Sequence, residues 1–164
     1  MAYSLKPLLE RLVFVGGCAV DLLVDDVAAN DVRITGDVDV IAEVATITEY
    51  YSLIGDLKKI GFNEVLPTED EPAPICRLSH KNMLLDVMPT DESILGFSNR
   101  WYLPAVKNAD IVELEEGLSI RLVSVAYFIA TKLIAFRSRG NSDYYCHDIH
   151  GRHHNCVQRK QSDC

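Results

Sequence analysis

The sequence has few basic residues relative to its acidic ones. It holds 16 Lys and Arg against 24 Asp and Glu, which gives a formal net charge of −8 at pH 7. Proteins that follow a long nucleic-acid backbone rely on clustered Lys and Arg to release the counterions of the phosphates. The acidic balance therefore argues against a broad phosphate-binding surface, and a nucleic-acid partner would need a local basic patch.

Long apolar runs are also missing. The longest, Leu12 to Val24, contains Asp21 and two glycines and is shorter than the roughly 20 residues needed to cross a bilayer. The N-terminal residues lack the order of basic, apolar and small residues that marks a secretory signal. We therefore expect a cytoplasmic protein with no membrane partner.

The cysteines do not suit a disulfide framework, because their number is odd and their spacing irregular. We expect reduced thiols and assign no bridges. The five positions are Cys18, Cys76, Cys146, Cys156 and Cys164.

The apolar content is sufficient for one domain. Of the 164 residues, 48% are hydrophobic, enough to bury a core without disulfides or oligomerisation. The composition changes at His150, after which the chain has three basic residues, one acidic residue and Val157 as its sole aliphatic side chain. The sequence predicts a domain over residues 1–149 and a polar tail over 150–164.

Two hypotheses concern this tail. Residues 150–157 can be encoded so that the next reading frame gives an apolar-periodic segment, which suggests a frame-shifted C-terminus in place of the ancestral one. The Cys and His residues between Cys146 and Cys156 are a zinc candidate, but their spacing matches no closed ligand pattern. We favour an unstructured tail over a zinc site.

Hydrophobic periodicity predicts strands and helices in mixed order, and hence an α/β (α+β) fold with a small mixed sheet flanked by helices. We expect strands at 12–15, 34–44 and 62–66, a hairpin of 75–78 and 83–88 turning at 80–82, and further strands within 97–121, where Pro104, Asn108 and Gly117 act as breakers. We expect helices at 19–23 and at 46–60, where Thr46 and Glu49 form a capping box. A long helix should follow with Leu122, Val125, Ala126, Ile129, Leu133 and Phe136 on its buried face, end at Gly140, and precede a helical piece from Ser142.

Two carboxylates in the second predicted strand are candidate metal ligands. Asp37 and Asp39 are two residues apart, so a strand points both side chains the same way. Two neighbouring anions are unfavourable without a cation, and oxygen ligands favour Mg²⁺ or Mn²⁺. Asp86 stands between apolar residues in a later strand, where a lone buried carboxylate is costly. Together the three could hold the ions used in phosphoryl transfer.

A glycine pair precedes these carboxylates. Gly16 and Gly17 follow a strand and precede a helix, where bare backbone N–H groups can receive a phosphate. Taken singly, a Gly-Gly pair is more often a tight turn, and an Asp-x-Asp pair more often a solvated strand face. Their occurrence together and in this order favours a nucleoside triphosphate site.

These residues resemble the signature of the polymerase-beta-like nucleotidyltransferase superfamily. The resemblance rests on Gly16-Gly17, on the segment from Arg33 through Thr35 to Val40, and on Asp86. Downstream, residues 132–149 are similar to a motif of the abortive-infection toxin-type nucleotidyltransferases and their uncharacterised relatives. The motif residues there are Lys132, Ala135, Arg137, Arg139, Gly140, Asp143, His147, Asp148 and Ile149.

The resemblance implies a nucleotidyltransferase fold and a role for each matching position. Asp37, Asp39 and Asp86 would be catalytic and would bind the divalent metal. The glycine turn would face the triphosphate, and the nucleotide site would be made by Gly16, Gly17, Arg33, Thr35 and Lys132. Supporting candidates around it are Arg137, Arg139, Asp143 and Asp148; the alternative for Lys132 is a lysine at the helix edge with its charge in water.

Two departures from the family pattern stand out. Nineteen residues separate Gly17 from Asp37, which is longer than usual. We interpret the acidic stretch from Asp25 to Asp31 as an insertion, although the interval could also mean that the turn is displaced from the metals. The tail is the other departure, because relatives continue with an apolar helical segment.

The sequence thus predicts an Mg²⁺-dependent enzyme that transfers a nucleoside monophosphate from a nucleoside triphosphate to an acceptor hydroxyl. The acceptor could be a tRNA end, a protein side chain or a small molecule. A non-catalytic nucleotide-sensing or partner-binding module on the same fold is the alternative. A homo-oligomer or a cognate antitoxin-like partner would fit either hypothesis.

Overall fold

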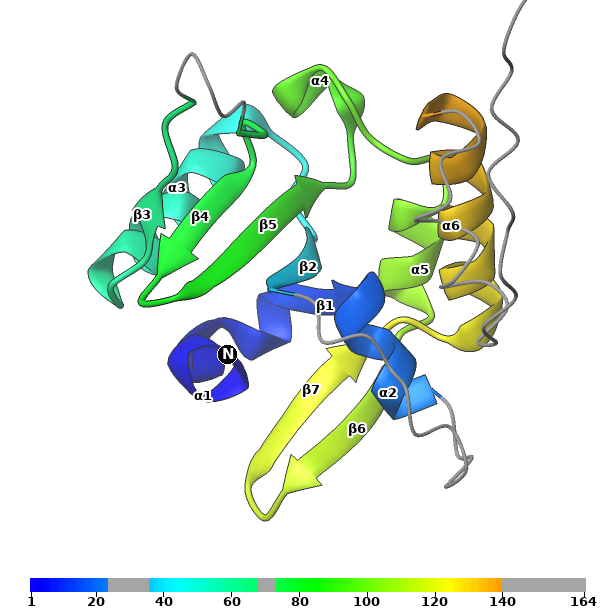
Figure 1. The fold of residues 1–164 in the computed structure, drawn as a ribbon, viewed down its shortest axis with the longest axis horizontal. Coiled ribbons are helices and arrows are strands. Elements are labelled where there is room, and N and C mark those ends of the chain that lie inside the picture. Colours follow the sequence, from blue (N-terminus) through cyan, green and yellow to red (C-terminus); the bar gives the residue numbers. More distant parts are fainter. Residues whose placement is uncertain (24–35, 68–72, 140–164) are drawn as a thin grey trace, which may run out of the picture.

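A seven-stranded mixed sheet forms the centre of the molecule (Figure 1). The computed structural model describes residues 1–23, 36–67 and 73–139. Strand β1 pairs with β2 antiparallel and with β7 parallel, and β2 pairs with β5 parallel. The predicted α+β class with a mixed sheet is therefore confirmed. The strands, in the sheet order β3-β4-β5-β2-β1-β7-β6, are β3 (Asn63–Glu64), β4 (Arg77–His80), β5 (Met83–Pro89), β2 (Asp37–Ala42), β1 (Leu12–Val15), β7 (Leu118–Leu122) and β6 (Asp110–Glu115).

Helices connect these strands and pack against the sheet (Figure 1). None of the described helices is both long enough and apolar enough to span a membrane. The α-helices are α1 (Ala2–Leu5), α2 (Val20–Leu23), α3 (Ile47–Lys59), α4 (Glu92–Leu95), α5 (Tyr102–Lys107) and α6 (Val125–Arg139), and the 3-10 helices are η1 (Lys6–Arg11) and η2 (Gly17–Ala19).

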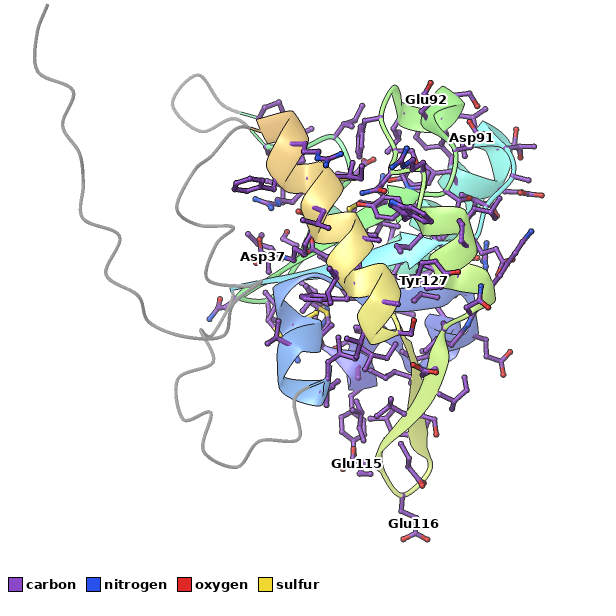
Figure 2. All side chains as sticks on the ribbon, turned by 90° about the vertical axis from the view of Figure 1, so that its right-hand side faces the viewer. Asp37, Asp91, Glu92, Glu115, Glu116 and Tyr127 are labelled. Atoms are coloured by element: carbon purple, nitrogen blue, oxygen red, sulfur yellow. The ribbon has the colours of Figure 1, made fainter. Side chains whose placement is uncertain are left out.

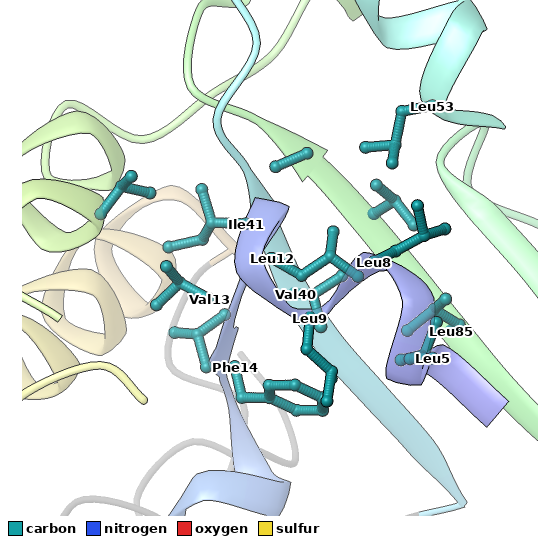
Figure 3. Packing of buried hydrophobic residues seen from close by; sticks show 14 of the residues in the cluster. Leu5, Leu8, Leu9, Leu12, Val13, Phe14, Val40, Ile41, Leu53 and Leu85 are labelled. Atoms are coloured by element: carbon teal, nitrogen blue, oxygen red, sulfur yellow. The ribbon is translucent and has the colours of Figure 1, made fainter. Parts of the chain in front are cut away.

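The central strands are covered on both faces. Val13 and Ile41 are register partners whose side chains point toward the side of α5 and α6, whereas Leu12 and Val40 point toward the N-terminal helices (Figure 3). All four side chains are inaccessible to solvent. Because side chains alternate along a strand, residues two apart on β2 share a face. Asp37 and Asp39 therefore lie on the face that α5 and α6 cover.

Helix α3 begins as its sequence predicts. The Thr46 hydroxyl accepts a hydrogen bond from the Glu49 backbone N–H at 3.2 Å. The Glu49 carboxylate in turn accepts one from the Ala45 N–H at 2.7 Å. The first bond satisfies an N–H group that the first helical turn would otherwise leave unpaired, and the second ties the residue before the N-cap to the helix. The chain leaves the helix at Gly61, whose φ is +96°.

The predicted hairpin is present with a shifted first strand. Its first strand is β4, over residues 77–80 and not 75–78, and β5 pairs with it antiparallel. The turn is two residues long, because His80 pairs directly with Met83. Lys81 adopts the left-handed conformation with φ at 56°, which tight hairpin turns require.

The segment from 97 to 121, for which the sequence predicts only strands, also contains helix α5. Pro104 was expected to break structure, but it is the third residue of α5. A proline in the first helical turn removes an N–H that has no partner within the helix, so it does not interrupt this one. Asn108 and Gly117 do end elements, since Asn108 caps α5 and Gly117 lies in the turn between β6 and β7.

The predicted buried face of the long helix is wrong. Leu122 belongs to β7, and Val125, Ile129 and Leu133 are 51%, 43% and 46% exposed. The helix instead buries Phe128 and Thr131, and the Asn99 side chain donates a hydrogen bond to the Thr131 carbonyl at 3.2 Å. Apolar residues occur all around α6, so their spacing did not determine which side faces the sheet. The helical piece expected from Ser142 and the tail lie outside the described residues.

Candidate functional site

Three neighbouring strands bring charged side chains into one row. Asp39 on β2 is the register partner of Asp86 on the parallel strand β5. Asp86 is in turn the partner of Arg77 on β4. Paired residues in a sheet point to the same face, and Asp37 shares that face because it is two residues from Asp39. The structure therefore gathers Asp37, Asp39 and Asp86 as the sequence predicts, together with a cation that the prediction lacked.

Arg77 binds the third carboxylate with both arms of its guanidinium. Its Nε donates to Asp86 Oδ1 and its Nη2 to Asp86 Oδ2, each at 2.7 Å. The same Nη2 lies 3.6 Å from Asp37 Oδ2. The fork geometry matches the two oxygens of a carboxylate, which makes this the strong form of the ion pair.

Burial differs along the row. Asp86 is only 8% exposed, whereas the side chain of Asp37 is 42% exposed. The hydrogen bond to Asp86 raises the pKa of Arg77 above its already high value, so the guanidinium stays charged at any physiological pH. Asp86 thus carries a buried negative charge that Arg77 compensates, while Asp37 faces solvent.

The glycine turn lies directly against the second carboxylate. Gly16 has a φ of +80°, and a Cβ built on it would lie 1.9 Å from Asp39 Oδ2. Val15, the last residue of β1, is the register partner of Asp39. The long interval before Asp37 therefore does not displace the turn from the carboxylates, and only glycine fits at position 16.

Two thiols flank the row and remain protonated. The Cys18 thiol donates to the Val15 carbonyl at 3.2 Å. Burial raises the pKa of Cys18 to about 11, and the charge of Asp39 acts in the same direction. Burial likewise raises the pKa of Cys76 to about 12, with the charge of Asp86 adding to it. Because a thiolate is the reactive form, neither of these free cysteines is suited to nucleophilic catalysis at neutral pH.

The row lies on the face of the sheet that is covered by α6, the helix that carries Lys132. Tyr102 of α5 donates a hydrogen bond to the sulfur of Met88 at 3.0 Å, and Met88 is two residues beyond Asp86 on β5. The Lys132 ammonium on α6 lies 5.7 Å from the centre of the Phe128 ring. Helix α6 thus lies on the same side of the sheet as the carboxylates. A contact between Lys132 and a phosphate stays a prediction.

The remaining predicted site residues are less well defined. Arg137 is exposed on α6. Arg139 ends this helix, and its side chain lies outside the described part. Arg33, Thr35, Asp143 and Asp148 also lie outside it, so their assigned roles stay predictions.

The acidic charge is spread over the molecule and is not confined to this row. Asp91 and Glu92 lie at one end, Glu115 and Glu116 at the tip of the β6–β7 hairpin at the other, and Asp37 between them (Figure 2). The net charge alone therefore does not identify the site. The pairing of Asp86 with Arg77 distinguishes the row from the other acidic surfaces.

The donor atoms fit a hard divalent cation at Asp37 and Asp39. Both side chains offer only oxygen, which Mg²⁺ prefers, and the absence of a side chain at Gly16 lets the Asp39 carboxylate lie directly against the backbone turn. Among the described residues, no three acidic, His or Cys side chains converge closely enough to form a ready metal centre. Both oxygens of Asp86 accept hydrogen bonds from Arg77, and a metal bond from Asp86 stays a prediction.

A signal for Arg77 was present in the sequence. A two-residue turn at Lys81-Asn82 sets the hairpin register and makes residues 77 and 86 opposite partners. The predicted three-residue turn at 80–82 shifts the register by one residue and does not pair Arg77 with Asp86. Asp86 is therefore predicted as a metal ligand and not as the partner of an arginine.

Comparison of the chain with protein-family models and with curated proteins finds no match.

Proposed function

We propose that this protein is a divalent-metal-dependent nucleotidyltransferase, which moves a nucleoside monophosphate from a nucleoside triphosphate to an acceptor hydroxyl and releases pyrophosphate. The observation that carries this proposal is the close approach of Gly16 to the Asp39 carboxylate. A bare backbone turn beside two carboxylates on one strand suits a triphosphate bound through a hard cation. A nucleotidyltransferase fold, implied by the resemblance to the polymerase-beta-like superfamily, is part of the proposal.

Each residue has a defined task in this reaction. Asp37 and Asp39 bind Mg²⁺ or Mn²⁺, which when bound neutralises phosphate charge and lowers the pKa of the acceptor hydroxyl. The backbone of Gly16 and Gly17 approaches the phosphates, and Lys132 supplies a fixed positive charge to them. Asp86 holds the Arg77 guanidinium beside Asp37.

The transfer itself is a substitution at the α-phosphorus. The acceptor oxygen forms a bond to this phosphorus while the bond to the oxygen that bridges to the β-phosphorus breaks. The hydroxyl proton passes to water, and pyrophosphate leaves. The acceptor is an RNA end, such as that of tRNA, or a protein side chain, or a small molecule.

The test is incubation of the full chain with each nucleoside triphosphate labelled at the α-phosphate, in Mg²⁺ and cell extract. Protein, RNA and small molecules are then separated, and label is sought in each fraction. We expect label in one fraction, dependent on Mg²⁺ and lost in Asp39→Asn. Absence of transfer with every nucleotide would contradict the proposal.

A nucleotide-sensing module without turnover is the second candidate, and the pairing of Arg77 with Asp86 favours it. A carboxylate that binds a guanidinium through both oxygens has less capacity to bind a catalytic cation. Metal-dependent binding of a triphosphate with no labelled product would select this candidate.

A further inference from the structure

We propose that the Arg77 guanidinium is the fixed second cation of this site, so that the site binds one divalent ion, at Asp37 and Asp39, and not two. This inference rests on the proposed function, because it concerns how the nucleotidyltransferase site is charged. Arg77 becomes a positioning residue, which acts through Asp86 and Asp37.

The geometry supports a permanent cation at this point. Arg77 and Asp86 are opposite partners on paired strands, and two 2.7 Å bonds join them. The guanidinium also reaches to 3.6 Å from Asp37. It thus places one positive charge between Asp86 on β5 and Asp37 on β2.

The charge of the cluster supports a single ion. Before a nucleotide binds, three carboxylates and one guanidinium leave two negative charges, which one divalent cation neutralises. A second divalent cation would have to share Asp86 and Asp37 with the Arg77 guanidinium, and like charges at short range repel strongly where water is partly excluded. With the guanidinium removed, three negative charges would favour a second ion.

Displacement of Arg77 by a metal ion is unfavourable. The Asp86 side chain is 11% exposed and that of Arg77 is 22% exposed, so breaking the pair would leave two poorly hydrated charges. Removing one partner of such a pair is more damaging than removing both. The ion pair therefore persists when a metal binds at Asp37 and Asp39.

The experiment counts metal ions in the full chain by electron paramagnetic resonance. Mn²⁺ is added with α,β-methylene ATP or α,β-methylene GTP, which resist transfer. Two Mn²⁺ ions held about 3.5–4 Å apart, as in two-metal sites, give a spin-coupled signal that a single ion does not give. The variants are Arg77→Met, Asp86→Asn, the double variant Arg77→Met/Asp86→Asn, and Arg121→Met as the control.

Arg121 is a matched control because its side chain is also 22% exposed. It donates to the carbonyls of Glu10 and Val106, away from the carboxylate row. Its loss reproduces the structural cost of removing a half-buried arginine without changing the charge of the site.

We expect one uncoupled ion in the wild type, in Arg121→Met and in the double variant, and a coupled pair in Arg77→Met. A coupled pair in the wild type, or a single ion in Arg77→Met, overturns the inference and leaves the proposed function intact. No bound Mn²⁺ in the wild type overturns both.

If Arg77→Met does not fold, Asp86→Asn, which keeps Arg77, tests whether Asp86 is a direct metal ligand. We expect it to retain the ion with less than about a tenfold change in Mn²⁺ affinity, the low end of what supporting residues contribute to metal sites. A larger loss would make Asp86 a direct ligand and overturn the inference.

Discussion

At the scale of single residues, Gly16 cannot be replaced without strain. Its φ of +80° strains any other residue, and a Cβ would collide with Asp39 Oδ2. We expect Gly16→Ala to lower the free energy of unfolding by about 2–4 kcal/mol and to weaken Mn²⁺ binding, because Asp39 must move. Denaturant unfolding and calorimetric titration measure the two effects.

The control for this substitution is Gly96→Ala. Gly96 also has a positive φ, +79°, but its ψ of 3° places it in the left-handed helical region, and nothing lies within 4 Å of a Cβ built there. Gly96→Ala should therefore cost about 1–2 kcal/mol, with unchanged metal affinity. An equal loss of metal affinity in the two variants would mean that the contact of Gly16 with Asp39 has no importance for binding.

Asp39 itself is expected to matter for binding and not for folding. Replacing it with Asn removes one of two neighbouring negative charges, so without metal the substitution should be neutral or stabilise by less than about 1 kcal/mol. Mn²⁺ binding should fall by about a hundredfold or more, since even supporting residues contribute ten- to a hundredfold. Unchanged affinity in a calorimetric Mn²⁺ titration would remove the metal site from this strand.

At the scale of elements, local sequence signals predicted where α3 begins, whereas the apolar pattern did not predict which side of α6 faces the sheet. The capping box fixed the start of α3, because Thr46 and Glu49 satisfy N–H groups within a few residues of themselves. The side of α6 that packs inward depends on distant partners such as Asn99, and its apolar residues surround the whole helix. Arg77 was missed for a related reason, since its role depends on the register of two strands.

Helix α6 also carries the prediction for Lys132. Its ammonium lies over the Phe128 ring, a contact that contributes about 0.5–1 kcal/mol at partly exposed sites. We expect Lys132→Ala to weaken triphosphate binding by about tenfold or more, because hydrogen bonds between charged groups contribute roughly 1.5–3 kcal/mol. Fluorescent-nucleotide titration and thermal unfolding separate the two effects.

Lys107→Ala is the matched control, because Lys107 lies in the last turn of α5, which packs on the same face of the sheet. It should leave both nucleotide affinity and melting temperature close to wild type. A large fall in the melting temperature of Lys132→Ala with intact nucleotide affinity would make Lys132 a structural residue.

At the scale of the whole molecule, the carboxylate row joins the centre of the sheet to its β3–β4 side. Asp37 and Asp39 come from β2, Asp86 from β5 and Arg77 from β4, and β2 and β5 are central strands of the sheet. A binding site made by these residues can form only when the three strands are assembled. Binding at the site and stability of the fold are therefore coupled.

This coupling predicts that Mg²⁺ stabilises the whole chain. At a hundred times its dissociation constant, a ligand that binds only the folded state adds about 2.7 kcal/mol to the free energy of unfolding, which corresponds to a rise of roughly 5–10 °C in melting temperature for a chain of this size. Sodium chloride at matched ionic strength should give a smaller rise, because it only screens the repulsion of an acidic molecule. The Mg²⁺ rise should disappear in Asp39→Asn while the sodium effect remains. If Asp39→Asn responds to Mg²⁺ as fully as the wild type, the stabilisation arises from acidic groups elsewhere, such as those at the β6–β7 hairpin tip, and the carboxylate row is not the metal site.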